Sequence, residues 1–266
     1  MFEVESLYVY PVKGMAGTPV SGATPEARGF RHDRRWMLVD PLNGFISQRE
    51  YPSLAGWQSH VDAAHLYISQ RKDPEVRLEI PLNHWDGHPH VPVRIWKDTV
   101  QAHISSSAID EWLAQNLGFP CRLVYMGSGS HRPVDPDYAL AGEEVSFADG
   151  YPYLITTTAS LDDFSQRMGK TLIVQRFRPN IVIRTRIPFE EDQWQQIHIG
   201  GHRLRLPKPC ARCQVITIDP DTASINPGVL TSLAGFRRDG NKVLFGVNAC
   251  WESGEGQIRV GDPVTI

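Results

Sequence analysis

One stretch organises this chain: Lys208-Pro209-Cys210-Ala211-Arg212-Cys213, which continues through Val215-Ile216-Thr217-Ile218 into Asp219-Pro220-Asp221-Thr222. It holds two of the four cysteines and two cations, and a turn-forming Asp-Pro-Asp follows the β-branched run. A thiolate close to cations is typical of a site that binds a soft metal or carries out redox chemistry. We therefore ask which other segments of the chain would build a pocket around Cys210.

The two cysteines form a single Cys-x-x-Cys motif, which several kinds of site share. A thioredoxin-like site would place it at the start of a helix in a βαβ unit, whereas a β-branched run follows it here. A structural zinc site needs two more ligands, and the sequence has no second Cys-x-x-Cys. We interpret His84, His88 and His90 as solvated loop histidines, because Gly87 and Pro89 break the segment that carries them. Spacing alone favours ordinary half-buried cysteines, whereas the cationic context favours a role for Cys210.

Length and composition indicate an ordinary globular protein. The 266 residues suffice for one large or two medium domains. The net charge of −3 predicts no general attraction to nucleic acid or membrane. No apolar run approaches the roughly 20 residues of a membrane span, and residues 1–10 lack the basic start of a signal peptide. Four cysteines make a poor disulfide framework for this length, which favours the cytoplasm.

The hydrophobic pattern predicts a β-rich α+β fold, and the 22 glycines and 20 prolines indicate many turns. Strands are expected at 2–10, 36–39, 45–49, 76–80, 91–96, 99–104, 181–183, 197–199, 203–206, 243–250 and 258–266. Pro11-Val12-Lys13-Gly14 predicts a turn with Lys13 at its apex.

Two helices are expected between these strands. One spans 106–118 and the other 160–168, with Asp110 and Asp163 placed to complete capping boxes. The Gly-, Ser- and Pro-rich segment 126–137 predicts a loop just inside a second domain that starts near residue 120.

Basic residues gather at the ends of predicted strands, where their side chains could meet on one rim. The clusters are Lys13, Arg34 with Arg35, Arg176 with Arg178, and Lys208 with Arg212. Arginine offers a planar fork that suits phosphate, and lysine offers a point charge. Arg178-Pro179-Asn180 is more specific, because proline fixes the backbone between a guanidinium and an amide that could read the edge of a heterocycle.

Together these segments resemble a known family, whose motifs occur here in the same order. They are Tyr10-Pro11-Val12-Lys13, Asp33-Arg34-Arg35-Trp36, Ala159-Ser160-Leu161, Phe177-Arg178-Pro179-Asn180, Cys210-Ala211-Arg212-Cys213 with Asp219-Pro220-Asp221-Thr222, and Val260-Gly261-Asp262-Pro263. Over nearly its whole length the chain is similar to the MOSC proteins, above all to the mitochondrial amidoxime-reducing component and its bacterial relatives. The resemblance implies an N-terminal β-barrel domain at 1–119, a MOSC β-barrel domain with a few helices at 120–266, and a cofactor between them.

The resemblance also implies a molybdenum cofactor, in which a pyranopterin dithiolene and one protein thiolate hold a single molybdenum. By position, Cys210 would be the molybdenum ligand and the catalytic residue. The residues that would contact the pterin or its phosphate are Lys13, Gly14, Arg34, Asp149, Gly150, Tyr151, Arg178, Asn180, Lys208 and Pro209. Eukaryotic relatives tend to carry serine at the position of Gly14, so backbone or water would replace a hydroxyl contact there.

The activity implied is reduction of N-hydroxylated compounds, such as amidoximes and hydroxylamino bases, to amines or amidines. Electrons would come from a separate ferredoxin- or flavoprotein-type partner. Two alternatives stay open: a carrier of molybdenum cofactor or sulfur with a persulfide on Cys210, and a binding module with a structural Cys-x-x-Cys. Beyond that motif, Cys121 and Cys250 are too few for an iron–sulfur cluster. No Gly-x-Gly-x-x-Gly follows a strand, so we expect no nicotinamide or flavin site.

Overall fold

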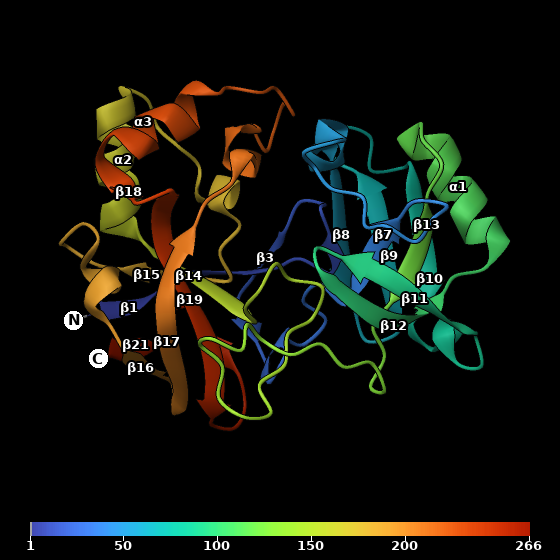
Figure 1. Ribbon diagram of the computed structural model, residues 1–266, viewed down its shortest axis with the longest axis horizontal. Helices are drawn as coiled ribbons and strands as arrows, with labels where there is room; N and C mark the ends of the chain where they lie inside the picture. The colour runs from blue at the N-terminus through green and yellow to red at the C-terminus, as the bar shows by residue number, and fades with distance from the viewer. Residues whose placement is uncertain (1) are drawn as a thin grey trace.

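The computed structural model describes residues 2–266 and is built mainly of strands arranged in two lobes (Figure 1). The helices are α1 (Ser107–Leu117), α2 (Thr158–Met168) and α3 (Gly228–Arg237). Short 3-10 helices are η1 (Pro52–Gly56), η2 (Leu82–Trp85), η3 (Val174–Phe177), η4 (Glu190–Gln193) and η5 (Gln214–Thr217). The strands of the first half are β1 (Phe2–Val9), β2 (Val12–Lys13), β3 (Thr18–Val20), β4 (Gly22–Ala23), β5 (Pro25–Glu26), β6 (Gly29–Phe30), β7 (Trp36–Val39), β8 (Trp57–Val61), β9 (His65–Gln70), β10 (Arg77–Pro81), β11 (His90–Ile95), β12 (Asp98–Ile104) and β13 (Arg122–Tyr125). Those of the second half are β14 (Tyr153–Thr157), β15 (Ile181–Arg184), β16 (Gln196–Ile199), β17 (His202–Ala211), β18 (Arg238–Asp239), β19 (Lys242–Ser253), β20 (Ile258–Arg259) and β21 (Pro263–Thr265).

Seven strands close into a barrel in the C-terminal lobe. Their order is β14-β15-β1-β21-β16-β17-β19, and β19 pairs back with β14, which closes the sheet. Apolar side chains such as Ile155, Ile183 and Val247 fill its interior. The barrel is therefore a packed core, and the surface at its rim is left for a site.

The first strand joins the two lobes. β1 pairs with β15 and β21 inside the barrel, although the chain after it builds the other lobe. Past Tyr10 the backbone crosses over and forms β2, which pairs in parallel with β7. Tyr10 and Val12 are fully buried at this crossing, so the crossing holds Lys13 at the boundary between the lobes.

The N-terminal lobe consists of the sheet β11-β12-β13-β7-β2 and the smaller sheet β10-β9-β8. Alternate residues of β7 point to opposite sides of the strand. Both sides are buried, because other elements cover each of them. Trp36 and Leu38 pack in one apolar cluster with α1, and Met37 and Val39 pack in a second cluster with β11 and β12. β7, which is packed on both sides, thus pairs with β2 and supports the backbone of Lys13.

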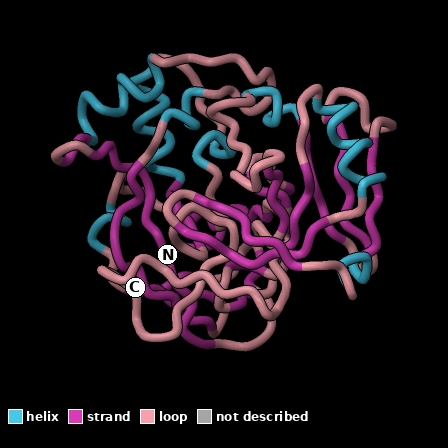
Figure 2. Tube along the Cα trace, turned by 45° about the vertical axis from the view of Figure 1, so that its right-hand side comes forward, coloured by secondary structure: helices cyan, strands magenta, loops and turns pink. Residues whose placement is uncertain are grey.

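Helices lie on the outside of both lobes (Figure 2). In the C-terminal lobe, α2 and α3 cover an aromatic cluster that contains Phe164, Phe177 and Phe245. α1 ends at Gly118, whose φ of +81° is the left-handed conformation that glycine adopts readily. Among residues 2–266, no helix has both the length and the apolar character required to span a bilayer.

The predicted fold class is confirmed, and most predicted strands and both predicted helices are present within a few residues. The strand predicted at 45–49 is absent, because that segment is irregular apart from an isolated bridge at Phe45. The sequence analysis missed β13 and β14, the hairpin of β8 and β9, the short strands between residues 18 and 30, and helix α3. Val229 and Leu233 of α3 are buried at helical spacing, a signal that could have revealed it.

Three further local predictions, on Lys13, Asp110 and the start of α2, were wrong. Lys13 is not at an exposed turn apex but on β2, where it is 8% exposed. The Asp110 carboxylate accepts hydrogen bonds from the Ser105 hydroxyl and the Leu123 amide instead of capping α1. α2 starts earlier than predicted, with Thr157 at its N-cap.

The histidines are also placed differently from the prediction. His90 lies on β11 opposite His103 of β12, and their Nε2 atoms are 3.1 Å apart. His84 lies in η2, and its Nε2 is buried without a hydrogen-bond partner among the described residues. They belong to the folded surface of the N-terminal lobe, because the Pro- and Gly-broken segment folds back onto β12.

Candidate functional site

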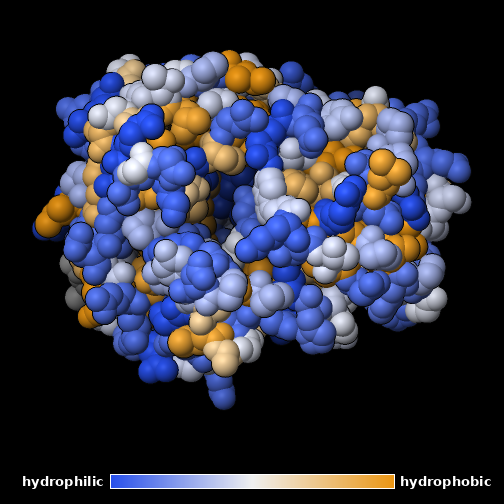
Figure 3. Space-filling view, viewed as in Figure 1, coloured by the Kyte–Doolittle hydropathy of each residue, from blue (hydrophilic) through white to orange (hydrophobic). Residues whose placement is uncertain are grey.

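A cleft of about 890 Å³, including its mouth, lies between the two lobes. Figure 3 shows a hollow between the lobes with hydrophilic residues around it. The lining residues are Lys13, Gly14, Arg34, Phe45, Ile46, Ser47, Gln48, Arg49, Trp96, Ala148, Asp149, Gly150, Tyr151, Tyr153, Leu154, Phe177, Arg178, Asn180, Cys210, Arg212, Cys213, Val215 and Asn248.

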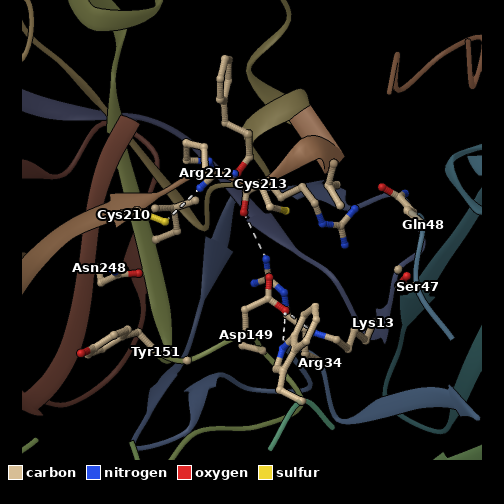
Figure 4. A pocket seen from close by; sticks show the side chains of 18 of the residues that line it. Lys13, Arg34, Ser47, Gln48, Asp149, Tyr151, Cys210, Arg212, Cys213 and Asn248 are labelled. Carbon is tan, nitrogen blue, oxygen red and sulfur yellow. Dashed lines mark hydrogen bonds and ion pairs between the residues drawn. The ribbon is translucent and has the colours of Figure 1, made fainter. Parts of the chain in front are cut away.

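Cys210 lies on the barrel side of the cleft, near the end of β17 (Figure 4). Its thiol is free and half-buried. Arg212 donates one hydrogen bond from Nη1 to Cys210 Sγ at 3.0 Å and another from Nη2 to the Phe177 carbonyl at 2.7 Å. Since the second bond fixes the guanidinium, Arg212 holds a positive charge beside the sulfur.

The strand around Cys210 is irregular, and its neighbour β19 supports it. The pairing of β17 with β19 shifts register between Pro209 and Ala211. The Asn248 side-chain amide on β19 donates to the carbonyls of Lys208 and Pro209 at 3.4 and 3.3 Å. Such a bulge re-aims a side chain, and here it leaves Cys210 on the cleft.

Lys13 and Asp149 meet across the boundary of the lobes. Lys13 Nζ donates to Asp149 Oδ1 at 2.5 Å. Burial lowers the pKa of Lys13, and the Asp149 charge only partly opposes this effect. Desolvation would raise the pKa of Asp149, but the charges of Lys13, Arg34 and Arg178 outweigh it and hold that pKa well below its usual range. The pair therefore links the two lobes at the cleft.

Arg34 is tied into a buried network. Its Nη1 donates to Asp33 Oδ2 at 2.5 Å and to Asn180 Oδ1 at 2.9 Å, and its Nη2 donates to the Arg178 carbonyl at 3.1 Å. The Asn180 amide also donates to the Tyr8 carbonyl at 3.3 Å. Asn180 is 1% exposed, so its amide chiefly joins the crossing segment to the barrel.

Arg178 differs because its guanidinium has no hydrogen bond or ion pair with any residue from 2 to 266. It lies over the Tyr10 ring at 4.5 Å, and Arg34 lies over the same ring at 4.1 Å. Burial lowers the pKa of Arg178 to about 10, and the Arg34 charge adds to this effect. Arg178 therefore presents a charge without a counterion to the cleft.

The N-terminal lobe supplies a wall that the sequence analysis missed. It consists of the segment from Phe45 to Arg49 together with Trp96 at the β11–β12 turn. The turn at Asn43-Gly44 brings this segment back alongside β7, where Phe45 bridges to Val39. Periodicity could not reveal this wall, because its residues lie in two loops about 50 positions apart.

Most residues that the sequence singled out line this cleft, but Arg35, Arg176, Lys208 and Pro209 do not. The Lys208 ammonium donates to Asp135 at 3.0 Å and lies 3.8 Å from the centre of the Tyr138 ring. This cation is thus neutralised beside the cleft, whereas Arg49, which the sequence did not single out, lines it.

The charges of the cleft are predominantly positive. The cations are Lys13, Arg34, Arg49, Arg178 and Arg212, and the lining carboxylate is Asp149. Within residues 2–266 there is no group of three or more His, Cys, Asp or Glu side chains arranged to hold a metal ion. The cleft thus combines a soft thiol with a rim of cations.

Two family models match this chain: the MOSC N-terminal beta barrel domain over residues 1–120 and the MOSC domain over residues 142–265. Human mitochondrial amidoxime-reducing component 1 is 30% identical over 99% of this chain and 82% of its own length. Human mitochondrial amidoxime reducing component 2 is 31% identical over 98% of this chain and 82% of its own length. Human molybdenum cofactor sulfurase is 29% identical over 92% of this chain, which spans 29% of that protein.

Proposed function

This chain belongs to the MOSC family, and on that premise we propose that it reduces N-hydroxylated compounds with a molybdenum cofactor bound at Cys210. One observation carries the proposal: a free thiol and an unneutralised arginine line one cationic cleft between the lobes. The substrates would include amidoximes and hydroxylamino bases. The reaction takes up two electrons and two protons, breaks the N–O bond and releases water, so that R–NH–OH becomes R–NH₂.

The residues of the cleft fit such a cofactor. Cys210 would supply the protein ligand to molybdenum, a role that suits a soft thiolate. The group would bring a metal that changes oxidation state by two electrons and accepts oxygen from an N–O group. Arg178 would bind its phosphate, because that guanidinium keeps all its donors free of other described residues.

The remaining contacts follow from where each side chain lies. Lys13, Gly14 and Arg34 line the cleft on the crossing side, and Asp149, Gly150 and Tyr151 line it near the barrel. Asn180 would act through the Arg34 network. Lys208 and Pro209 would act through the backbone that carries Cys210, since their carbonyls are held by Asn248.

Arg212 would orient the sulfur. It contacts Cys210 directly and is itself anchored on Phe177. Electrons would come from a separate ferredoxin- or flavoprotein-type donor. The four free cysteines fit a reducing compartment such as the cytoplasm, where we propose that the protein works.

The decisive experiment combines composition with turnover. The protein is purified from a host that makes the cofactor, and molybdenum, pterin and labile sulfur are measured per chain. We expect one molybdenum and one pterin, and reduction of benzamidoxime to benzamidine with reduced methyl viologen. Labile sulfur on Cys210 without molybdenum would replace this proposal with the carrier function. Molybdenum without reduction of any N-hydroxylated compound would also overturn it.

A further inference from the structure

We propose that Trp96 selects the substrate, and that its indole receives planar aromatic N-hydroxylated compounds at the cleft. This inference rests on the proposed function, because it names the substrate class of the same site. Trp96 and Phe45 together form what we call the aromatic wall, and both residues line the cleft that contains Cys210.

The backbone at Trp96 is strained and the side chain is exposed. Trp96 occupies the turn between β11 and β12 with a φ of +56°. Left-handed backbone is unfavourable for a bulky residue, and glycine or asparagine would form such a hairpin turn more readily. The indole is also 44% exposed, although tryptophan is usually largely buried. Since neither turn formation nor core packing explains tryptophan here, we look to its contacts for the reason.

Those contacts hold the indole at the boundary of the lobes. Its Nε1 donates to Asp149 Oδ1 at 3.3 Å, and Asp149 belongs to the side that carries the barrel. The Phe45 ring meets it at 4.7 Å with a 64° angle between planes. The Arg49 guanidinium lies 4.3 Å from the indole centre. The ring is thus fixed in orientation by three neighbours while part of its surface stays open.

A fixed, partly open indole suits a flat aromatic ligand, because aromatic groups pair by stacking or edge-on contact. The charges around Trp96 restrict the class of ligand further. Arg49 and Lys13 lie 4.3 and 5.8 Å from the indole centre, and the Asp149 carboxylate that contacts the indole balances only one of these two charges, so a cationic ligand would be disfavoured there. An amidoxime is neutral at neutral pH, whereas the amidine that it yields is a cation. The wall would therefore favour an aryl amidoxime over its own product.

The test compares Trp96→Ala with Trp96→Phe, and uses Leu42→Ala as the matched control. Leu42 is in the same lobe, is 78% exposed and does not line the cleft. Each variant is assayed with benzamidoxime and with acetamidoxime, which lacks the ring, using reduced methyl viologen. Benzamidoxime binding to the oxidised holoprotein is measured by calorimetry without reductant, and molybdenum is measured in every sample.

We expect Trp96→Ala to raise the KM for benzamidoxime about three- to tenfold, which is the range for one lost aromatic pair. Acetamidoxime should change little, Trp96→Phe should restore most of the difference, and Leu42→Ala should match the wild type. Equal losses on both substrates, or loss of molybdenum from Trp96→Ala, would overturn the inference. If wild-type protein with molybdenum reduces neither compound, the proposed function fails on its own. Calorimetry then decides on Trp96: weaker benzamidoxime binding in Trp96→Ala than in Trp96→Phe supports it, and equal or absent binding overturns it.

Discussion

At the scale of single residues, the cations of the cleft differ in whether other residues of the protein already form hydrogen bonds or ion pairs with them. Arg34 holds Asp33, which is fully buried, and burial alone would raise the pKa of that carboxyl. Removing Arg34 would leave a buried carboxylate without its partner, which costs several kcal/mol. Arg178 forms no ion pair with any of the described residues, so its charge is available to a ligand.

We predict that Arg178→Ala lowers pterin occupancy without changing the unfolding midpoint of the cofactor-free protein. A charged hydrogen bond is worth roughly 1.5–3 kcal/mol, which corresponds to about a tenfold or greater loss of affinity. Arg184→Ala is the matched control, because Arg184 is exposed and pairs with Glu3 and Glu5 on the surface. Arg34→Ala should lower both occupancy and stability. Pterin content equal to wild type in Arg178→Ala would contradict this assignment.

The two cysteines of the motif should also differ in their contribution to molybdenum binding. We predict that Cys210→Ser abolishes molybdenum retention and turnover, whereas Cys213→Ser keeps both. Arg212 donates to Cys210, whereas Cys213, which also lines the cleft, has no side-chain hydrogen bond with any residue from 2 to 266 and is exposed at the start of η5. Metal analysis and the benzamidoxime assay of the two variants provide the measurement. Full molybdenum in Cys210→Ser would refute the ligand assignment.

At the scale of elements, β19 pairs with β17 and supports this strand, which carries Cys210. Gly246 of β19 has a φ of +73°, and a Cβ there would lie 2.5 Å from the Ile155 carbonyl oxygen on β14. Only glycine lets these two strands approach so closely, and their pairing closes the barrel. A single position thus couples barrel closure to the Cys210 strand.

We predict that Gly246→Ala destabilises the fold by at least about 2 kcal/mol, since a backbone clash adds to conformational strain. Gly256→Ala is the matched control: its φ is +85°, but nothing lies within 4 Å of an added Cβ. That variant should lose only about 1 kcal/mol from backbone strain. Urea unfolding of both proteins measures the difference, and equal losses would rule out the close approach as the cause.

His202, the first residue of β17, gives a prediction about pH. It is 1% exposed, and Trp251 Nε1 donates to its Nδ1 at 3.2 Å. Burial lowers the pKa of His202 below its ordinary value of 6.5, so the folded state binds the proton less well than the unfolded state. Its contribution to stability is therefore complete above the unfolded-state pKa and is lost as the pH falls below that value.

We expect the free energy of unfolding to decrease less between pH 7.5 and pH 5 in His202→Gln than in the wild type. Glutamine keeps an acceptor for Trp251 but does not titrate. His60→Gln, at an exposed position, serves as the control. Identical pH profiles for His202→Gln and wild type would show that His202 does not titrate with unfolding.

At the scale of the whole molecule, the cleft exists because two lobes meet at a fixed crossing. If the chain is divided at 119/120, as we propose, β1 belongs to the first domain by sequence and to the barrel by pairing. A second contact joins the lobes where Arg71 donates to the Pro220 carbonyl and to Asp221 at 2.8 Å. These contacts would keep the aromatic wall opposite Cys210.

We predict that the isolated protein cannot use NADH or NADPH directly. The two cysteines outside the motif lie in separate apolar clusters, and burial raises the pKa of both Cys121 and Cys250 to about 12. They are therefore unreactive thiols that offer no route for electrons. Benzamidoxime reduction is measured with NADH alone, with NADPH alone and with reduced methyl viologen. Robust turnover on a nicotinamide alone would overturn the prediction of a separate donor.

The sequence alone determined the elements and the chemical types of the site residues. Alternation marked most strands, glycine and proline marked the turns, and the Cys-x-x-Cys with nearby cations marked Cys210, because these signals depend on residues close together in the chain. Only the tertiary structure decided which residues meet. Lys13 contacts Asp149 across 136 positions of sequence, and Lys208, two residues before Cys210, is instead neutralised by Asp135. Trp96 and Arg49 join the site only because two separate turns reach the same edge of the N-terminal lobe, and no local pattern encodes that convergence.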